Sequence, residues 1–146
     1  MYYHVNYADF AIGEIIQPGG WGRQIRQFRP GGPMPTPETL AVLLWEVAME
    51  SARVIVDPKL CSRLHCTFVW ETIELAVSFR NQTRPNAHIF ELEATSDNPT
   101  YRGDFSLITH NNPTQAYADY MSETCKKYWT TPASEAPGYC MAAVYV

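Results

Sequence analysis

The chain has 146 residues, of which 46% are hydrophobic and 18% charged, and its formal net charge is −4 at pH 7. These values predict a single domain over residues 1–146 with a hydrophobic core, and they exclude low-complexity disorder, collagen and coiled coil. The acidic balance gives no general attraction to nucleic acids or anionic membranes. The longest purely apolar run, Leu40 to Trp45, is too short to span a bilayer, and no charged-then-apolar leader precedes the first expected strand. We therefore expect a cytoplasmic protein without a membrane partner.

The first part of the chain predicts a strand, a long loop and a long helix. Residues Tyr2 to Asn6 are aromatic and β-prone, which is typical of a strand. The segment from Pro18 to Pro37 is rich in glycine and proline and carries three arginines, so we expect a functional or mobile loop there. Thr36 as N-cap and Pro37 in the first turn predict a helix that continues to about Arg53.

The long helix is expected to be mostly buried. Its apolar face is formed by Leu40, Leu43, Leu44 and Val47. A narrow polar stripe faces water and consists of Thr39, Glu46, Glu50 and Arg53. Within this stripe, Glu50 and Arg53 are spaced to form a local ion pair.

The rest of the chain predicts an alternation of short strands and helices. We expect strands over His65–Trp70, His88–Ala94 and Tyr139–Val146. A short helix is expected from Thr72 to about Arg80, and a second long one from Asn112-Pro113 onward. The sum is an α+β fold, a compact domain with a short-stranded sheet and two or three packed helices.

The four cysteines, Cys61, Cys66, Cys125 and Cys140, predict reduced thiols because a domain of this size needs no disulfides. Cys61, His65 and Cys66 lie close together and invite a zinc interpretation. Their spacing is not that of a two-residue cysteine pair, and no second Cys/His pair follows. We therefore expect no metal site.

Common catalytic motifs are missing from the sequence. The glycines around Trp21 lack the lysine of a phosphate-binding loop, and there is neither a Gly-x-Ser-x-Gly elbow nor a His-Glu-x-x-His helix. What remains is an ordered set of weaker features. His4 and Asn6 share one face of the first strand, Ser62-Arg63 precedes a later strand, Phe68 and Phe79 are separated by ten residues across a strand and helix, and Glu135 lies before the last strand.

In order and spacing this set resembles the ADP-ribosyltransferase superfamily in its His-Tyr-Glu branch, and small bacterial and phage proteins thought to share that fold. The resemblance implies a split sheet and NAD as substrate. It implies Glu135 as the catalytic acid, with His4, Asn6, Arg63, Phe68 and Phe79 as NAD contacts. The two phenylalanines would clamp the nicotinamide ring, and Arg63 or an arginine of the 23–29 loop would neutralise the diphosphate. The aromatic pair differs from the family's two tyrosines.

Several alternatives stay open at this stage. Asp104, Glu91 or Glu123 would replace Glu135 if that residue is not the acid. The acceptor would be a macromolecule, with protein favoured over nucleic acid. A catalytically degenerate relative would instead bind and inhibit a partner protein. A relative of the RNA 2′-phosphotransferases would need several arginines converging with His4.

Overall fold

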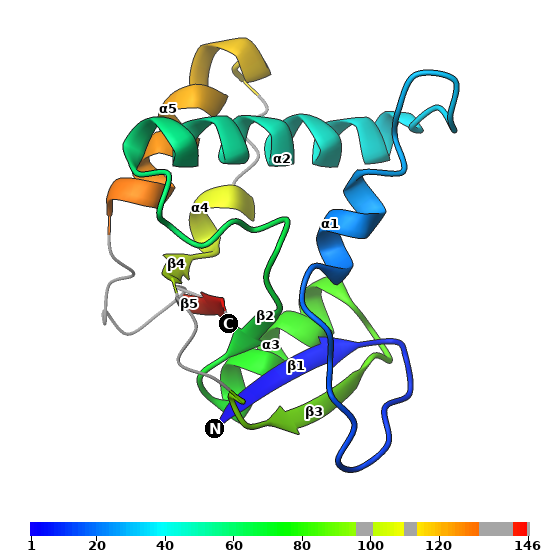
Figure 1. Ribbon diagram of the computed structural model, residues 1–146. Helices are drawn as coiled ribbons and strands as arrows, with labels where there is room; N and C mark the ends of the chain where they lie inside the picture. Colours follow the sequence, from blue (N-terminus) through cyan, green and yellow to red (C-terminus); the bar gives the residue numbers. More distant parts are fainter. Residues whose placement is uncertain (96–100, 110–113, 132–141, 146) are drawn as a thin grey trace.

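The computed structural model describes residues 1–95, 101–109, 114–131 and 142–145, and these build one antiparallel sheet with helices packed on it (Figure 1). The strand order is β3-β1-β2-β5-β4. The strands are β1 Tyr2–Asn6, β2 Phe68–Trp70, β3 His88–Leu92, β4 Tyr101–Asp104 and β5 Ala142–Tyr145. All four neighbouring pairs are antiparallel. The predicted α+β class is confirmed.

The strand bounds agree with the sequence prediction for the two longest strands, which have β-prone or alternating residues. The predicted span of β1 is confirmed, and β3 ends only two residues earlier than expected, at Leu92. The strand predicted from His65 begins instead at Phe68, because the backbone turns before it and the His65 N–H donates to the Ser62 carbonyl at 3.0 Å. The short strand β4 was not predicted. It pairs with β5 at the edge of the sheet.

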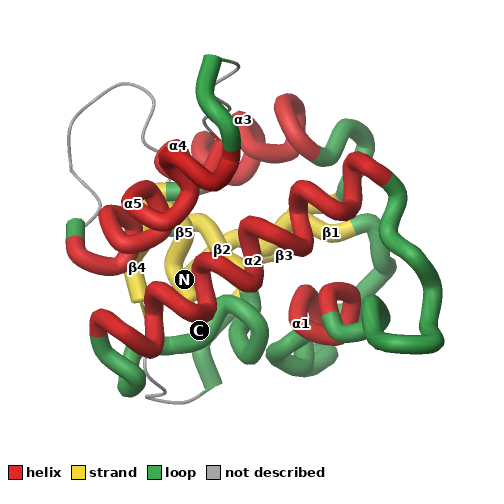
Figure 2. The backbone as a smooth tube through the Cα atoms, turned by 90° about the horizontal axis from the view of Figure 1, so that it is seen from above, coloured by secondary structure: helices red, strands yellow, loops and turns green. Residues whose placement is uncertain are grey.

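The helices are α1 Gly20–Ile25, α2 Pro37–Val56, α3 Ile73–Thr83, α4 Ser106–Thr109 and α5 Tyr117–Thr130. In Figure 2, α2 runs across the strands and α5 lies beside it. Thr36 and Thr72 cap α2 and α3, each accepting a hydrogen bond from the third residue beyond it, as the sequence indicates for Thr36. The predicted start of α5 at Asn112-Pro113 lies outside the described residues, and the helix is described from Tyr117.

Part of the expected long loop is helical. The six residues of α1 begin after Gly19, whose φ of +81° suits a residue without a side chain. The helix packs closely on the chain before β2, and a Cβ at Gly22 would overlap the Leu64 carbonyl. Gly22 thus allows α1 to lie against this segment.

The predicted orientation of α2 is wrong. Leu40, Leu44 and Val47 are 44%, 43% and 56% exposed, whereas the polar residues Glu46 and Arg53 are 5% and 9% exposed. The reason lies in the segment that follows the helix, since residues 58–63 make hydrogen bonds with this polar side. The predicted Glu50–Arg53 ion pair is confirmed at 2.8 Å, but it lies against this segment rather than in open water.

The main core lies between α2, α5 and the sheet. Met49, Cys125 and Tyr128 are at most 1% exposed. The Trp129 indole N–H donates to the Met49 carbonyl at 2.8 Å and ties the two helices together. Among the described residues, no helix has both the length and the apolar character needed to cross a bilayer.

Candidate functional site

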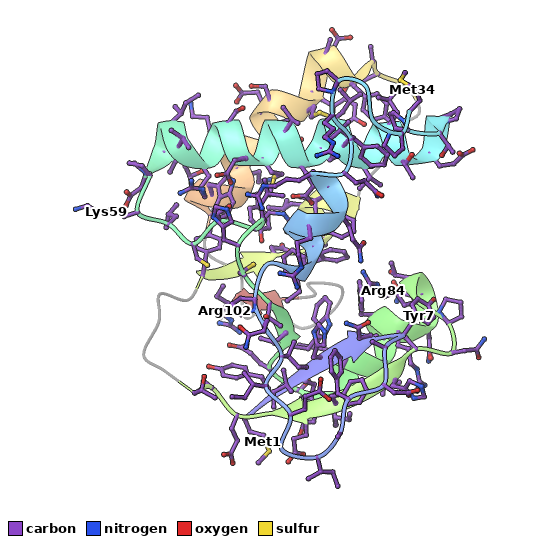
Figure 3. The ribbon with its side chains drawn as sticks, turned by 45° about the vertical axis from the view of Figure 1, so that its right-hand side comes forward. Met1, Tyr7, Met34, Lys59, Arg84 and Arg102 are labelled. Carbon is purple, nitrogen blue, oxygen red and sulfur yellow. The ribbon has the colours of Figure 1, made fainter. Side chains whose placement is uncertain are left out.

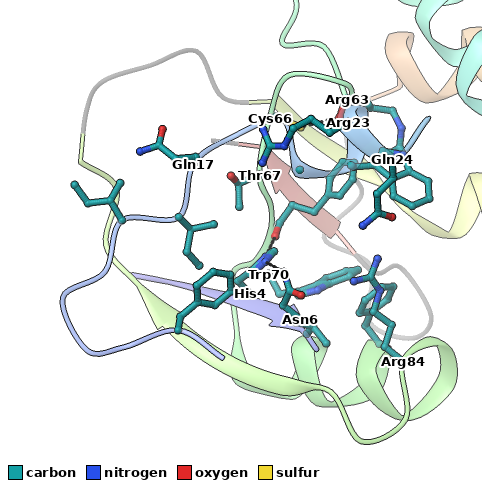
Figure 4. Close-up of a pocket in the computed structure, with 18 of the residues that line it drawn as sticks. His4, Asn6, Gln17, Arg23, Gln24, Arg63, Cys66, Thr67, Trp70 and Arg84 are labelled. Atoms are coloured by element: carbon teal, nitrogen blue, oxygen red, sulfur yellow. Dashed lines mark hydrogen bonds between the residues drawn. The ribbon is translucent and has the colours of Figure 1, made fainter. Parts of the chain in front are cut away.

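A cavity of about 350 Å³ opens where β1 and β2 separate (Figure 4). The two strands share a single bridge, Tyr3 opposite Trp70, whereas β1 pairs with β3 along its whole length. Beyond that bridge the space is lined by β1, the segment 10–17, α1, the chain before β2 and β2 itself, together with Phe79 of α3, Arg84 and Phe105. The five predicted NAD contacts all line it: His4, Asn6, Arg63, Phe68 and Phe79.

His4 spans the gap between the two strands. Its Nδ1 lies 2.7 Å from the Phe68 carbonyl oxygen, so it donates there, and its Nε2 lies 3.0 Å from Asn6 Nδ2 and accepts from that amide. These bonds select the neutral tautomer protonated on Nδ1. Burial lowers the pKa of His4, and the charge of Arg84 lowers it further, although the bond to Phe68 opposes both. His4 is therefore a neutral group that holds the strands and orients Asn6.

Arg63 reaches the cavity wall but is held by protein partners. Its guanidinium donates to both carboxylate oxygens of Glu46, at 2.7 and 3.1 Å, and both side chains are 6% exposed. The same guanidinium lies over the Phe68 ring at 4.9 Å and near the hydroxyl of Tyr128 at 3.5 Å. A planar bidentate pair of this kind fixes Arg63 in place.

The aromatic side chains are arranged differently from the expected clamp. Phe79 packs on Trp70 with a centroid distance of 4.7 Å, and Phe105 meets the two rings edge-on at 5.4 and 5.7 Å. Phe68 lies under Arg63 instead. Phe68 and Phe79 thus line the same cavity, but the aromatic ring that packs on Phe79 is that of Trp70. The sequence predicted Trp70 only as a strand residue.

Two further arginines line the same cavity and make fewer hydrogen bonds within the protein than Arg63 does. Arg84 is the residue that follows α3 (Figure 3). Its side chain lines the cavity and makes no hydrogen bond or ion pair with any residue that the structure describes. Arg23 on α1 donates to the Pro18 carbonyl at 3.0 Å. Arg23 belongs to the 23–29 segment that the sequence suggested, but Arg84 was missed, because an arginine at a helix end ordinarily complements the helix dipole.

Trp21 adds a donor without an acceptor. Its indole Nε1 is buried at the cavity and finds no hydrogen-bond partner within the described ranges. Buried indole N–H groups usually have one. The Trp21 indole N–H is therefore an unsatisfied donor within the wall of the cavity.

The acidic residues are distributed unevenly. Glu135 lies outside the described residues. Asp104 is buried and accepts from the backbone and hydroxyl of Ser106 at 2.9 and 2.6 Å, while Glu91 and Glu123 are exposed, and none of the three lines the cavity. Glu14 is the one carboxylate among the described lining residues, and it accepts from the Ala11 N–H at 2.9 Å.

A shallower hollow of about 440 Å³ adjoins the cavity and shares Arg23 with it. Its lining is Arg23, Arg26, Gln27, Arg29 and Pro33, without a carboxylate. Arg26 contacts His65 and the Leu64 carbonyl, and Arg29 makes no side-chain hydrogen bond with the described part of the chain. The hollow is therefore a concentration of positive charge on an acidic protein.

No group of three or more His, Cys, Asp or Glu side chains among the described residues is arranged to hold a metal ion. No family model matches the chain, and a search of curated proteins finds no match. Interpretation of the site therefore depends on its own geometry.

Proposed function

We propose that this protein is an NAD-dependent ADP-ribosyltransferase that modifies a macromolecule in the cytoplasm of a bacterium or a phage-infected cell. One observation supports the proposal above all. His4, Asn6, Arg63, Phe68 and Phe79 are far apart in sequence, yet they line one cavity. Its volume of about 350 Å³ lies in the range of small-molecule sites, which starts at roughly 300 Å³.

The reaction breaks the bond between nicotinamide and ribose through a sugar with cationic character, as in glycoside hydrolysis. Flat side chains are needed for the nicotinamide, and Phe79, Trp70 and Phe105 offer them. A carboxylate must stabilise the positive charge as it develops. We assign this role to Glu135, with Glu14 as the lining carboxylate that would replace it.

The polar side chains that line the cavity are assigned to different parts of NAD. Asn6 uses one amide proton for His4 and keeps the second for a ribose hydroxyl, so His4 acts as a positioning residue. Arg84 and Arg23 suit the diphosphate better than Arg63, because Glu46 already occupies the Arg63 guanidinium.

The acceptor we propose is a protein with an acidic surface. The arginine-lined hollow adjoins the cavity and shares Arg23 with it, so an acidic segment bound there would reach the reacting ribose. It also lies within the Pro18–Pro37 segment, for which the sequence predicts a functional or mobile loop. Arginine forks suit carboxylates through bidentate bonds.

The test is calorimetric titration of NAD into the wild type, Phe79→Ala and Glu135→Gln, with release of nicotinamide followed separately. We expect Phe79→Ala to abolish binding, and Glu135→Gln to retain binding but stop the release. Tyr117→Ala, an exposed aromatic on α5 away from the cavity, is the matched control and should leave both unchanged. Absence of heat at millimolar NAD would refute the proposal.

A second candidate function is binding and inhibition of a partner protein by a catalytically degenerate site. Two observations favour it. Glu46 holds Arg63, and α2 exposes large apolar side chains, including Leu40, Val47 and Ile55. Under this alternative NAD would not bind, and Val47→Asp would abolish inhibition of the partner while Phe79→Ala would not.

The RNA 2′-phosphotransferase alternative also gains an observation, since Arg23, Arg63 and Arg84 share the cavity with His4. The same NAD assay separates it from the main proposal. Nicotinamide release that depends on RNA carrying an internal 2′-phosphate would favour this reaction, whereas release that depends on a protein acceptor would exclude it.

A further inference from the structure

The arginine-lined hollow beside the cavity is formed by Arg23, Arg26, Gln27, Arg29 and Pro33 and has a volume of about 440 Å³. Its three guanidinium groups belong to exposed residues. No carboxylate lines the hollow among the described residues. It therefore presents several N–H donors and a positive potential to whatever binds there.

None of the three arginines has a negatively charged partner in the part of the chain that the structure describes. Arg23 donates to one backbone carbonyl, at 3.0 Å. Arg26 donates to another carbonyl and to Nε2 of His65, at 3.4 and 2.6 Å, and an Nε2 that accepts belongs to a neutral ring. Arg29 makes no side-chain hydrogen bond or ion pair with the described residues. The positive charge of all three is thus left uncompensated.

Three other arginines of the described chain are paired with acids. Arg53, Arg63 and Arg102 each donate to a glutamate, at 2.8, 2.7 and 2.9 Å. Acidic partners are not scarce, since the chain has 15 acidic and 11 basic residues. Three like charges in one hollow repel one another, and a bound anion removes this repulsion. The contrast indicates a site for an anionic ligand.

Internal hydrogen bonds hold the backbone that carries these arginines. Arg23 lies in the last turn of α1 and Arg26 caps its C-terminus, so their three-residue spacing brings them to one side of the helix. Ile25, between them, is 7% exposed and anchors the helix end. The Gly32 N–H donates to the Arg29 carbonyl at 2.8 Å and closes the turn that follows. The hollow is therefore part of the folded structure.

The number of guanidinium groups favours a phosphate over a carboxylate. One arginine fork satisfies the two oxygens of a carboxylate. A phosphate monoester carries about 1.5 to 2 negative charges at pH 7 and three strong acceptor oxygens, so it accepts from several arginines at once. Arginine clusters are the usual means by which proteins recognise phosphorylated side chains.

We propose that this hollow binds the phosphate group of a phosphoserine or phosphothreonine on a partner protein. Nucleic acid is the other macromolecular source of phosphate, but it carries a regular row of charges that a protein contacts along an extended basic surface. Here three arginines are gathered in one hollow, and the whole chain has a net charge of −4, which repels a polyanion. A single phosphorylated side chain fits both features.

Arg23 connects the hollow with the cavity, because it lines both (Figure 4). A phosphorylated residue held by Arg26 and Arg29 would bring the neighbouring residues of its chain next to the cavity. That the phosphoprotein is the acceptor of ADP-ribose rests on the proposed function. The phosphate site itself needs no NAD, so its failure and that of the proposed function are separate results.

NMR of arginine side chains tests the site on the ¹⁵N-labelled wild-type chain, in a phosphate-free buffer at pH 7 without NAD. The probes are a blocked alanine–phosphoserine–alanine peptide and the same peptide with serine or glutamate in the middle. We expect the phosphopeptide to shift the Nε–H signals of Arg23, Arg26 and Arg29 until they saturate. The glutamate peptide should bind roughly tenfold or more weakly, and the serine peptide should not bind. Equal affinities for phosphoserine and glutamate, or no saturable shift, would overturn the proposal.

Arg29→Ala distinguishes a specific site from general attraction. Because Arg29 bonds to no described residue, the variant should keep the fold while its affinity for the phosphopeptide falls roughly tenfold. Arg29→Lys keeps the charge but loses the fork, and it should also weaken binding. Arg80→Ala, the matched control, removes a positive charge from α3 that does not line the hollow, and it should leave the affinity unchanged.

Two results with these samples would contradict the assignment. Equal losses of affinity in Arg29→Ala and Arg80→Ala would show that only the overall charge matters. A single-stranded RNA oligonucleotide that shifts the same arginine signals at lower concentration than the phosphopeptide would identify nucleic acid as the ligand instead.

Discussion

The polar cluster beneath α2 and the cavity between β1 and β2 both contain arginines. The two regions differ in whether these arginines have hydrogen-bond acceptors within the protein. The cluster consists of Glu46, Glu50, Arg53, Ser62 and Arg63. In it, each carboxylate faces a guanidinium, and Ser62 donates to Glu50 at 2.8 Å. In the cavity, Arg84 and the Trp21 N–H find no acceptor among the described residues. A closed network of this kind stabilises the fold, whereas an open set of donors is suited to a ligand.

The largest effect is expected from breaking the closed network. Arg63→Ala leaves the Glu46 carboxylate buried without its partner, and loss of one member of a buried pair costs about 3–5 kcal/mol of unfolding free energy. Urea denaturation measures this loss. The paired replacement Glu46→Leu with Arg63→Met should recover most of it, because it removes both charges. A loss below about 1 kcal/mol in Arg63→Ala would mean that the cluster contributes little.

Replacing an arginine of the cavity should weaken ligand binding and leave stability nearly unchanged. Arg84→Ala is expected to leave the unfolding free energy within about 0.5 kcal/mol, as for other substitutions that break no internal contact. Loss of a charge-assisted hydrogen bond of about 1.5–3 kcal/mol would weaken NAD binding roughly tenfold to a hundredfold. Arg80→Ala is the matched control, since Arg80 lies on the same helix, bonds to Asn81 and does not line the cavity. Equal NAD affinities in the two variants would remove Arg84 from the site.

His4 lies between the two regions and predicts a pH dependence. Its pKa is lowered in the folded protein from the ordinary 6.5, chiefly by burial, so below pH 6.5 the unfolded chain binds more protons than the folded one. His4 therefore contributes stability above pH 6.5, and this contribution is lost as the pH falls towards its lowered pKa. The slope from one such group is at most about 1.4 kcal/mol per pH unit.

Denaturation at pH 7.5 and pH 5.5 checks this dependence. His4→Asn keeps a donor for Phe68 but does not titrate, so the difference in stability between the two pH values should shrink. The wild type, measured in the same two buffers, is the reference. An unchanged difference in His4→Asn would show that His4 is not the responsible group.

The sequence predicted well what depends on local signals. The span of β1 follows from its β-prone run, and Thr36 was identified as the cap of α2 from the residue type and the following proline. His4 and Asn6 were placed on one face by strand alternation, and they are hydrogen-bonded. Features that depend on distant partners were missed. Nothing near Arg84 in the sequence indicates that α3 directs it into a cavity built by β1 and α1.

The reversed faces of α2 show the same limit. Periodicity separates the polar stripe from the apolar face, but it does not say which of the two is buried. Burial of Glu46 and Arg53 is possible because Arg63 and the carbonyls of residues 58 and 60 satisfy their charges. Those contacts come from the segment after the helix, which the periodicity within the helix does not take into account.

The smallest expected effect tests this reversal. Leu44 is 43% exposed and Met49 is 1% exposed, although periodicity assigned Leu44 to the buried face. Leu44→Gln should change the unfolding free energy by no more than about 0.5 kcal/mol, the usual range for a surface substitution. Met49→Ala on the same helix should cost about 2–5 kcal/mol, because it removes a side chain packed between α2 and α5. If Leu44→Gln instead destabilises the protein as much as Met49→Ala, the apolar face of α2 is covered in solution, and a concentration-dependent midpoint would then identify a second copy of the chain as the cover.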